Sequence, residues 1–209
     1  MRYIIEQAGE SRSFPDGDPF LGGAADEAEV LILLGAAFTP DETRTAILIE
    51  LATDCLGVHT GEAAGGEGSN AVGFARYRNG DDPPSPLIEL VRQPNTSEAA
   101  IAAARAVFEA VGLTVVISAD QAGRIIDRLV RAKYNAALRF LDEGLATARD
   151  MDLTCRLGLG YPDGPIERVE RGGLARHYDV TKALFDVYGT AAYAPARRAV
   201  VAKMREGKA

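Results

Sequence analysis

The sequence has few cysteines and no excess of positive charge. Its two cysteines, Cys55 and Cys155, lie far apart and neither belongs to a C-x-x-C pair. This excludes a disulfide framework, gives no indication of a zinc site, and leads us to expect a reducing, cytoplasmic location. Lys and Arg number 23 against 30 Asp and Glu, for a net charge of −7. Non-specific binding of nucleic acid requires a basic surface, so that class of partner is not expected.

Long apolar runs are also missing. No stretch of about 18 consecutive apolar residues occurs, so we expect no membrane-spanning helix. The apolar part of the N-terminal MRYIIEQAGESR is too short for a signal peptide. A hydrophobic content of 47% with 25% charged residues is typical of a globular protein. Together these features predict a soluble cytoplasmic protein.

The third absence is a glycine-rich dinucleotide loop. Dinucleotide-binding domains place G-x-G-x-x-G between the first strand and a helix whose N-terminus receives the pyrophosphate. Residues 2–6 predict a strand, but the following QAGESRSFPDGD has neither this spacing nor a helical period, and we interpret residues 7–27 as a loop. The cluster GEAAGGEG at 61–68 carries two glutamates and no lysine, and is interpreted as a flexible linker. No cofactor is therefore expected, and NAD binding in the usual mode is not predicted.

The N-terminal part of the chain nevertheless alternates between strand and helix patterns. Thr39 and Pro40 form a capping signal that predicts a helix running to about Asp54. A second cap at Ser97 predicts a helix that ends at Gly112. The further predicted strands are 28–35, 55–59, 71–77, 86–92 and 113–118. This alternation favours a small α/β domain with a mostly parallel sheet.

The pattern changes after Asp120. Apolar residues then recur at intervals of three and four, which predicts amphipathic helices. The expected helices span about 122–143, 147–158, 165–172, 174–188 and 195–206. We therefore expect two domains, at 1–120 and 121–209.

Three segments carry a resemblance to a known family. They are PLIELVRQPNTSEA, AGRIIDRLVRAKYNAALRFLDEG and GLGYPDGPIE, which follow one another in this order. In this arrangement they resemble 3-hydroxyacyl-CoA (3-hydroxybutyryl-CoA) dehydrogenases, over about residues 28–205. The chain is most similar to the C-terminal part of longer bacterial members, standing alone with its own initiator methionine. The resemblance implies an α/β reduced Rossmann-like domain, followed by an all-α helical domain like the C-terminal domain of 6-phosphogluconate dehydrogenase.

The resemblance also implies a set of reacting groups. The family transfers a hydride between a 3-hydroxyacyl-CoA and NAD, with a histidine as general base and a carboxylate that orients it. Glu89 matches the catalytic glutamate, and its alternative interpretation is a partly exposed strand residue kept as a remnant. Ala75 occupies the place of the histidine. A methyl group cannot accept a proton, so this departure argues against the reaction.

The resemblance also bears on the interpretation of three further polar residues. Asp127 stands where the family has an asparagine; its favoured interpretation is a surface residue paired with Arg124 or Arg131 at helical spacing. His59 stands where the family has a Thr-Ser run near the nicotinamide, and is a candidate substitute base. His177 is predicted to be a surface or interface residue.

Two functions follow. The first is a degenerate dehydrogenase homologue that acts as a dimerising or accessory subunit in acyl-CoA metabolism, forming a homodimer or binding a full-length 3-hydroxyacyl-CoA dehydrogenase through its helical domain. The alternative is a functional 3-hydroxyacyl-CoA dehydrogenase whose NAD site is rebuilt or supplied by a partner. Binding of acyl-CoA without turnover is a third possibility.

Overall fold

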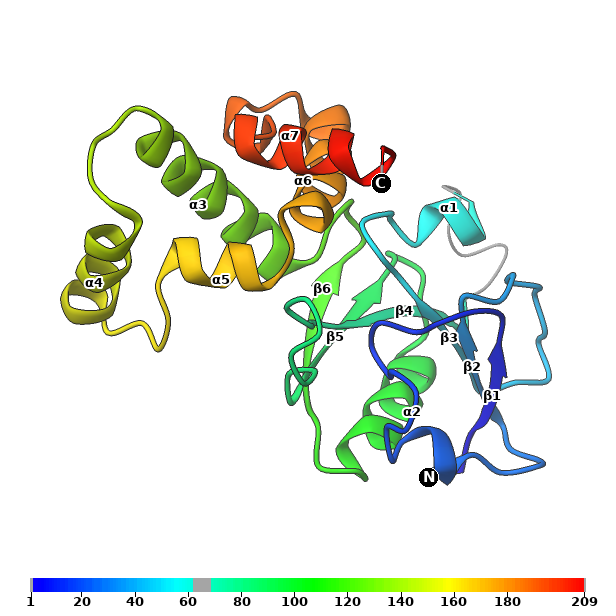
Figure 1. The fold of residues 1–209 in the computed structure, drawn as a ribbon. Coiled ribbons are helices and arrows are strands. Elements are labelled where there is room, and N and C mark those ends of the chain that lie inside the picture. Colours follow the sequence, from blue (N-terminus) through cyan, green and yellow to red (C-terminus); the bar gives the residue numbers. More distant parts are fainter. Residues whose placement is uncertain (1, 62–68, 209) are drawn as a thin grey trace. The chain divides into compact units, whose positions relative to one another are not determined.

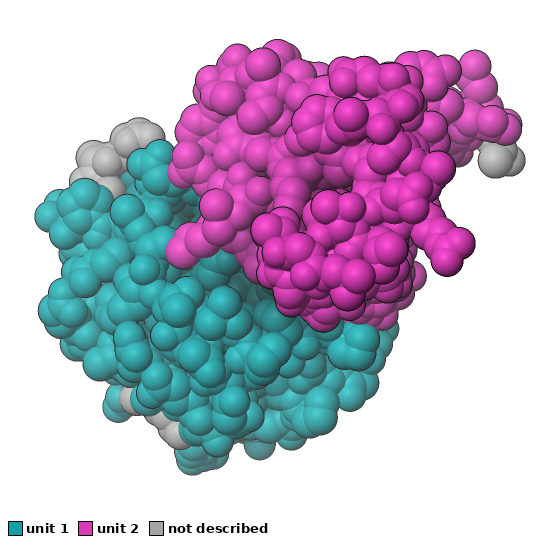
Figure 2. Space-filling model, turned by 90° about the vertical axis from the view of Figure 1, so that its left-hand side faces the viewer, with its two compact units in different colours: residues 1–78, 83–124 teal, residues 79–82, 125–209 magenta. Residues whose placement is uncertain are grey.

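The computed structural model describes residues 2–61 and 69–208 (Figure 1). These residues form two compact units (Figure 2). Unit 1 comprises Met1–Arg78 and Pro83–Arg124, and unit 2 comprises Asn79–Asp82 and Ile125–Ala209. Each unit has a hydrophobic core of its own. Most of the glycine-rich segment 61–68 lies outside the described residues.

Unit 1 is built on a mixed sheet. Its described strands are β1 (Ile4–Gln7), β2 (Val30–Leu34), β3 (Ala46–Glu50), β4 (Ala71–Arg76), β5 (Leu87–Arg92) and β6 (Thr114–Ala119). They lie in the order β1-β2-β3-β4-β5-β6, which is also their order in the sequence. All neighbours are parallel except β4 and β5. The prediction of a mostly parallel sheet is confirmed.

Two predicted elements are wrong. The helix expected from Thr39 to about Asp54 is instead a turn followed by the strand β3. Asp41 accepts hydrogen bonds from the amide of Thr43 and from Arg44 Nε, which closes the turn. The run Ala46–Glu50 then enters the sheet between β2 and β4 and is buried on both faces. A short strand buried on both faces has no alternating pattern, so its sequence is indistinguishable from a buried helix segment.

The second wrong element is the strand expected at 55–59. The structure forms the short helix α1 (Gly57–Thr60) there. Asp120, from the end of β6, accepts hydrogen bonds from the amides of Leu56 and Gly57 at 2.7 and 2.9 Å. These amides open the helical turn, and their partner is distant in the sequence. Local sequence therefore could not indicate this helix.

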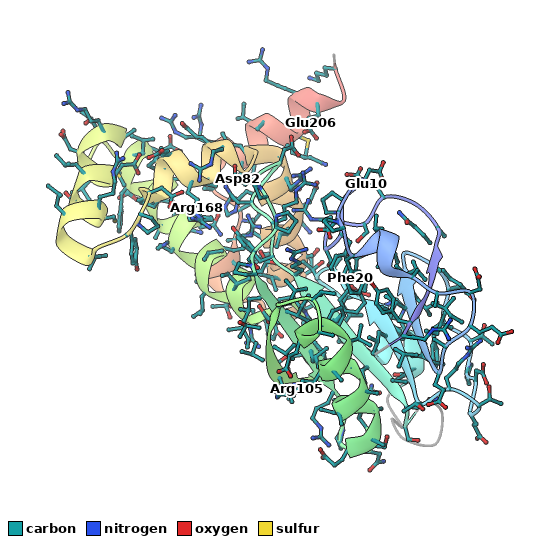
Figure 3. The ribbon with its side chains drawn as sticks, turned by 90° about the horizontal axis from the view of Figure 1, so that it is seen from below. Glu10, Phe20, Asp82, Arg105, Arg168 and Glu206 are labelled. Atoms are coloured by element: carbon teal, nitrogen blue, oxygen red, sulfur yellow. The ribbon has the colours of Figure 1, made fainter. Side chains whose placement is uncertain are left out.

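Each face of the sheet is covered differently. One face, here called the α2 face, packs against α2 (Glu98–Glu109), which Ser97 caps by accepting from the amide of Ala100. Phe14 and Phe20, from the loop after β1, pack on the same face with their rings stacked 4.0 Å apart (Figure 3 labels Phe20). The loop also contains the 3-10 turn η1 (Leu21–Gly23). The opposite face, here called the α1 face, packs against loop residues such as Phe38, Leu51 and Leu56.

Unit 2 is helical, as predicted. Its described helices are α3 (Ile125–Asp142), α4 (Ala148–Leu159), α5 (Pro165–Arg171), α6 (Leu174–Tyr188) and α7 (Arg197–Glu206), with a 3-10 turn η2 (Ala191–Tyr193). Tyr134, Leu138, Ile166 and Val169 lie at the centre of its core. Residues Asn79–Asp82, from the turn between β4 and β5, belong to this unit, because Asn79 Nδ2 donates to Arg168 O at 3.1 Å and Arg171 Nε donates to Asp82 at 3.0 Å (Figure 3 labels Asp82 and Arg168).

The architecture is thus an α/β Rossmann-like fold with a helical part. Among the described residues, none of the helices combines the length and the apolar character needed to cross a bilayer.

Candidate active site

Glu89 lies in the middle of β5, and its position follows from the alternation of the strand. Its neighbours Ile88 and Leu90 point into the α2 face, so Glu89 points to the α1 face, where it is only 4% exposed. The antiparallel register of β4 and β5 places Ala75 directly opposite Glu89. Side chains opposite one another in such a pair have their Cβ atoms about 5 Å apart. A base at position 75 would therefore adjoin this carboxylate, but the chain supplies only a methyl group.

His59 lies on α1 in unit 1. Its Nε2 atom lies 2.7 Å from the Asp54 carboxylate, and both side chains are about one-third exposed or less. The pairing leaves the Nδ1 atom of the imidazole outside this hydrogen bond. A carboxylate bound to one imidazole nitrogen fixes the tautomer of the ring, which is the arrangement that a general base requires.

A chain of polar side chains holds α1 in place. Thr60 Oγ1 donates to Gln93 Oε1 at 2.8 Å, and Gln93 Nε2 donates to Asp120 Oδ2 at 3.1 Å. Asp120 in turn accepts hydrogen bonds from the two backbone amides at the start of α1. The sequence analysis missed Asp54, Gln93 and Asp120. Asp120 and Gln93 each directly follow a strand, and a polar residue at that position is the one signal that could have indicated them.

Asp127 lies in unit 2, on the first turn of α3. Arg131 donates to it from Nε at 2.9 Å, so the expected pairing at helical spacing is present, with Arg131 as the partner. Arg131 is itself buried, and its Nη1 atom lies 3.4 Å from Nδ1 of His177. Asp127 is therefore an ion-pair partner of a buried cation and accepts hydrogen bonds only.

His177 corrects the sequence analysis, which placed it at a surface or interface. Its side chain is 0% exposed, and its Nε2 atom lies 3.0 Å from Oδ1 of Asn135. Burial, followed by the positive charge of Arg131, lowers the pKa of His177 to about 3. The imidazole is neutral at pH 7, and because Arg131 can only donate to Nδ1, the proton lies on Nε2 and is donated to Asn135.

The loop after β1 uses its hydrogen-bond donors within the protein. Ser11 Oγ and the amide of Ser13 both donate to Glu50 Oε1, at 2.9 and 2.8 Å. Residues 8–29, all of which are described, contain no α-helix between β1 and β2. No helix N-terminus is therefore available for a phosphate group at this place. Within the described residues, no group of three or more His, Cys, Asp or Glu side chains is placed to hold a metal ion.

Comparison with known proteins relates the helical unit to a family. Residues 123–209 match the family model for 3-hydroxyacyl-CoA dehydrogenase, C-terminal domain. A probable 3-hydroxyacyl-CoA dehydrogenase of Caenorhabditis elegans is 36% identical over 100 residues, which are 48% of this chain and 31% of the relative. Residues 123–209 thus match the C-terminal domain of the 3-hydroxyacyl-CoA dehydrogenase family.

Two further proteins are similar to the chain. The 3-hydroxybutyryl-CoA dehydrogenase of Mycobacterium tuberculosis H37Rv is 32% identical over 114 residues, which are 54% of this chain and 40% of the relative. The crystal structure of M. tuberculosis FadB2 superposes with a TM-score of 0.70 at 23% identity, covering 87% of this chain and 67% of that one. That likeness concerns the fold. The chain spans well under half of the length of these curated relatives.

Proposed function

We propose that this chain is a degenerate 3-hydroxyacyl-CoA dehydrogenase homologue, without NAD binding of the usual kind and without independent turnover. It acts as a dimerising or accessory subunit in acyl-CoA metabolism, in the cytoplasm. Its partner is a second copy or a full-length 3-hydroxyacyl-CoA dehydrogenase. The observation that carries the proposal is the pairing of Glu89 with Ala75, because the reaction needs a proton acceptor where only a methyl group is present.

The strand order gives independent support. In doubly wound sheets the dinucleotide binds at the point where the strand order reverses. The described strands follow one another across the sheet without a reversal. In a dinucleotide-binding domain a helix follows the first strand. Here Phe14 and Phe20 follow β1 and pack on the α2 face instead, and the backbone amide of Ser13 donates to Glu50. A pyrophosphate would have to displace this carboxylate.

The helical unit supports the accessory role. Its helix α4 buries one side chain, that of Asp152, and leaves several large apolar side chains exposed. Those on α4 and the turn before it are Leu145, Leu153, Leu157 and Leu159. Leu153 and Leu157, four residues apart, share one face of α4, and exposed apolar side chains that share a face mark contact with another molecule. We assign this surface, called here the α4 surface, to the partner.

The test is oxidation of NADH by the purified chain with acetoacetyl-CoA, with the M. tuberculosis 3-hydroxybutyryl-CoA dehydrogenase as the positive control. We expect no turnover above the protein-free rate, and no change with Glu89→Gln. Addition of a full-length dehydrogenase should yield a complex by size-exclusion chromatography if the partner is the catalytic enzyme. Turnover by the chain alone that is lost in Glu89→Gln would refute the proposal.

One observation favours the alternative, a functional dehydrogenase. The His59–Asp54 pair has the 2.7 Å contact of a histidine held by a carboxylate, and could replace the missing base. In that case His59→Gln should lower turnover by about 10²-fold or more, the usual contribution of a general base. Equal rates for His59→Gln and the unmodified chain would exclude His59 as the base.

A further inference from the structure

The strand β6 forms one edge of the sheet of unit 1, beside β5 (Figure 1). The amide of Thr114 donates to Pro86 O, so the even-numbered residues of β6 direct their backbone groups toward β5. These groups alternate in direction along a strand, so Val115 and Ile117 direct theirs outward. In the part of the chain that the structure describes, no strand lies on this outer side and the backbone of neither residue hydrogen-bonds to another segment.

The edge formed by β6 has none of the usual protection against pairing. Exposed edges generally carry a charge, a proline or a bulge, or are covered by another segment. The residues of β6, TVVISA, include no charge, proline or glycine, and the first four are β-branched. Ile117 is 38% exposed on this strand. β-branched residues favour the extended conformation, so β6 is suited to pair with a further strand.

The opposite edge, formed by β1, is protected. The amide of Ala8 donates to Leu34 O, so the even-numbered residues of β1 face β2 and the backbone of Tyr3 faces outward. The carbonyl of Tyr3 accepts from the amide of Ala25 at 2.8 Å, so the loop before β2 covers part of this edge. Glu6 adds a charge to the strand. The two edges therefore differ, and the edge that remains open is that of β6.

The sequence of β6 is complementary to itself in the antiparallel direction. When two copies pair about Val116, this residue lies opposite its own copy, Val115 lies opposite Ile117, and Thr114 lies opposite Ser118. Apolar β-branched side chains then face one another and hydroxyl groups face hydroxyl groups, which are stabilising cross-strand pairs. Val115 and Ile117 are the outward-directed residues, so in this register they exchange backbone hydrogen bonds.

The side chains select this register over its neighbours. Pairing about Val115 or about Ile117 would place a hydroxyl group opposite a valine instead. The Ser118 hydroxyl donates to Leu90 O at 3.4 Å within the sheet, so its oxygen is left to accept from the Thr114 hydroxyl of the other copy. The pairing also covers Ile117 with a buried-type residue, the Val115 of the other copy.

We propose that β6 of one chain pairs antiparallel with β6 of a second copy, about Val116, so that the two sheets become continuous. This goes beyond the proposed function, because the contact lies in unit 1 and uses neither Glu89 nor the α4 surface. One strand edge buries less than the roughly 1,200–2,000 Å² of a stable interface. The contact therefore joins chains or dimers in concentrated solution, and leaves them separate when dilute.

The test is disulfide trapping with the purified full chain in concentrated solution under mild oxidation. In the proposed register Val116 faces its own copy at a pair without backbone hydrogen bonds, where Cβ atoms are about 4.5–5.5 Å apart. Thr114 lies roughly 13 Å along the strand from its own copy. Val116→Cys should therefore crosslink two chains at least about tenfold faster than Thr114→Cys. The unmodified chain is the control for Cys55 and Cys155.

Two further variants test the register and the hydrogen bonds. Thr114→Cys combined with Ser118→Cys should crosslink, and peptide mass spectrometry should locate the bond between the two different positions. Ile117→Pro removes an outward amide and leaves the pairing with β5 intact, because this amide does not donate to β5. Added to Val116→Cys, it should slow crosslinking about tenfold.

The proposal is overturned if Val116→Cys crosslinks no faster than Thr114→Cys, or if its bond runs to another segment of the second copy. Preferential crosslinking to an added full-length dehydrogenase would assign the edge to that enzyme and would also overturn it. The Val116→Cys crosslink should persist when Leu153→Glu and Leu157→Glu are added. Failure of the α4 surface and failure of the β6 contact are thereby distinguished.

Discussion

At the scale of single residues, unit 2 depends on a polar network inside its helices. Asn135 accepts from His177 and from the amide of Ala196, and donates to Thr181 and to the carbonyl of Ala192. All four hydrogen-bonding positions of the amide are used. Because His177 is the neutral member of this network, its protonation would oppose Arg131 and remove the acceptor that Arg131 uses. The network therefore requires a neutral imidazole.

We predict that acidification destabilises the protein through His177. Its pKa is about 3 in the folded state against 6.5 in the unfolded state, so between these values the unfolded state binds the proton and folding is opposed. The contribution of His177 to the free energy of unfolding is fully present above pH 6.5. It falls by about 1.4 kcal/mol for each pH unit below that value. Urea unfolding at pH 7.5 and pH 5.0 should show a loss of about 2 kcal/mol from this residue.

The control is the variant His177→Gln. Its loss of unfolding free energy between pH 7.5 and pH 5.0 should be smaller than that of the unmodified chain by about 2 kcal/mol. If the variant does not fold, NMR titration of the His177 ring serves instead, and its signals should not shift between pH 7.5 and pH 5.0. An imidazole that titrates near pH 6 would contradict the prediction.

At the scale of secondary structure, three elements with local capping signals formed where the sequence indicated. Ser97 and Thr147 cap α2 and α4, and Pro165 opens α5. The helix predicted from Thr39 to about Asp54 also had a local capping signal, at Thr39 and Pro40, and it was wrong. The helical turn at 55–59, predicted as a strand, depends on Asp120, a partner distant in the sequence. The run at Ala46 became a strand because β2 and β4 supply hydrogen bonds on both sides. A cap is read from adjacent residues, whereas a central strand is decided by its neighbours in the sheet.

The cap of α2 gives a prediction for this scale. Ser97→Ala removes the acceptor for the amide of Ala100 and should lower the free energy of unfolding by about 1 kcal/mol, measured by urea denaturation. Ser97→Asp restores an acceptor of suitable length and should recover most of the loss. Equal destabilisation by both substitutions would show that the cap contributes little.

At the scale of the whole molecule, the proposed function requires an interface. The α4 surface exposes Leu157 at 79% and Leu153 at 45%. The two side chains are four residues apart on one helix, and neighbouring exposed apolar side chains mark contact sites. Dimers of identical chains use one surface twice, so a single apolar patch suffices to form one.

We predict that the chain sediments as a dimer and that Leu153→Glu combined with Leu157→Glu yields a monomer, because two carboxylates would be buried without partners. Val111→Glu is the matched control: it introduces a charge at an exposed apolar residue of unit 1, at 48% exposure, and should leave the dimer intact. Sedimentation velocity distinguishes the species. A dimer that survives the double substitution would remove the α4 surface from the proposal.

The sequence by itself determined the helices of unit 2, the mostly parallel character of the sheet and the resemblance to the family, because each depends on periodicity, caps or motifs within a short stretch. The resemblance also predicts that Ala75 stands in the place of the family's histidine, and this needs only comparison along the chain. The tertiary structure alone decided that Ala75 adjoins Glu89 across two strands, that Asp54 holds His59, and that His177 is buried. These contacts join residues through register, loop closure and packing, and no local pattern encodes them.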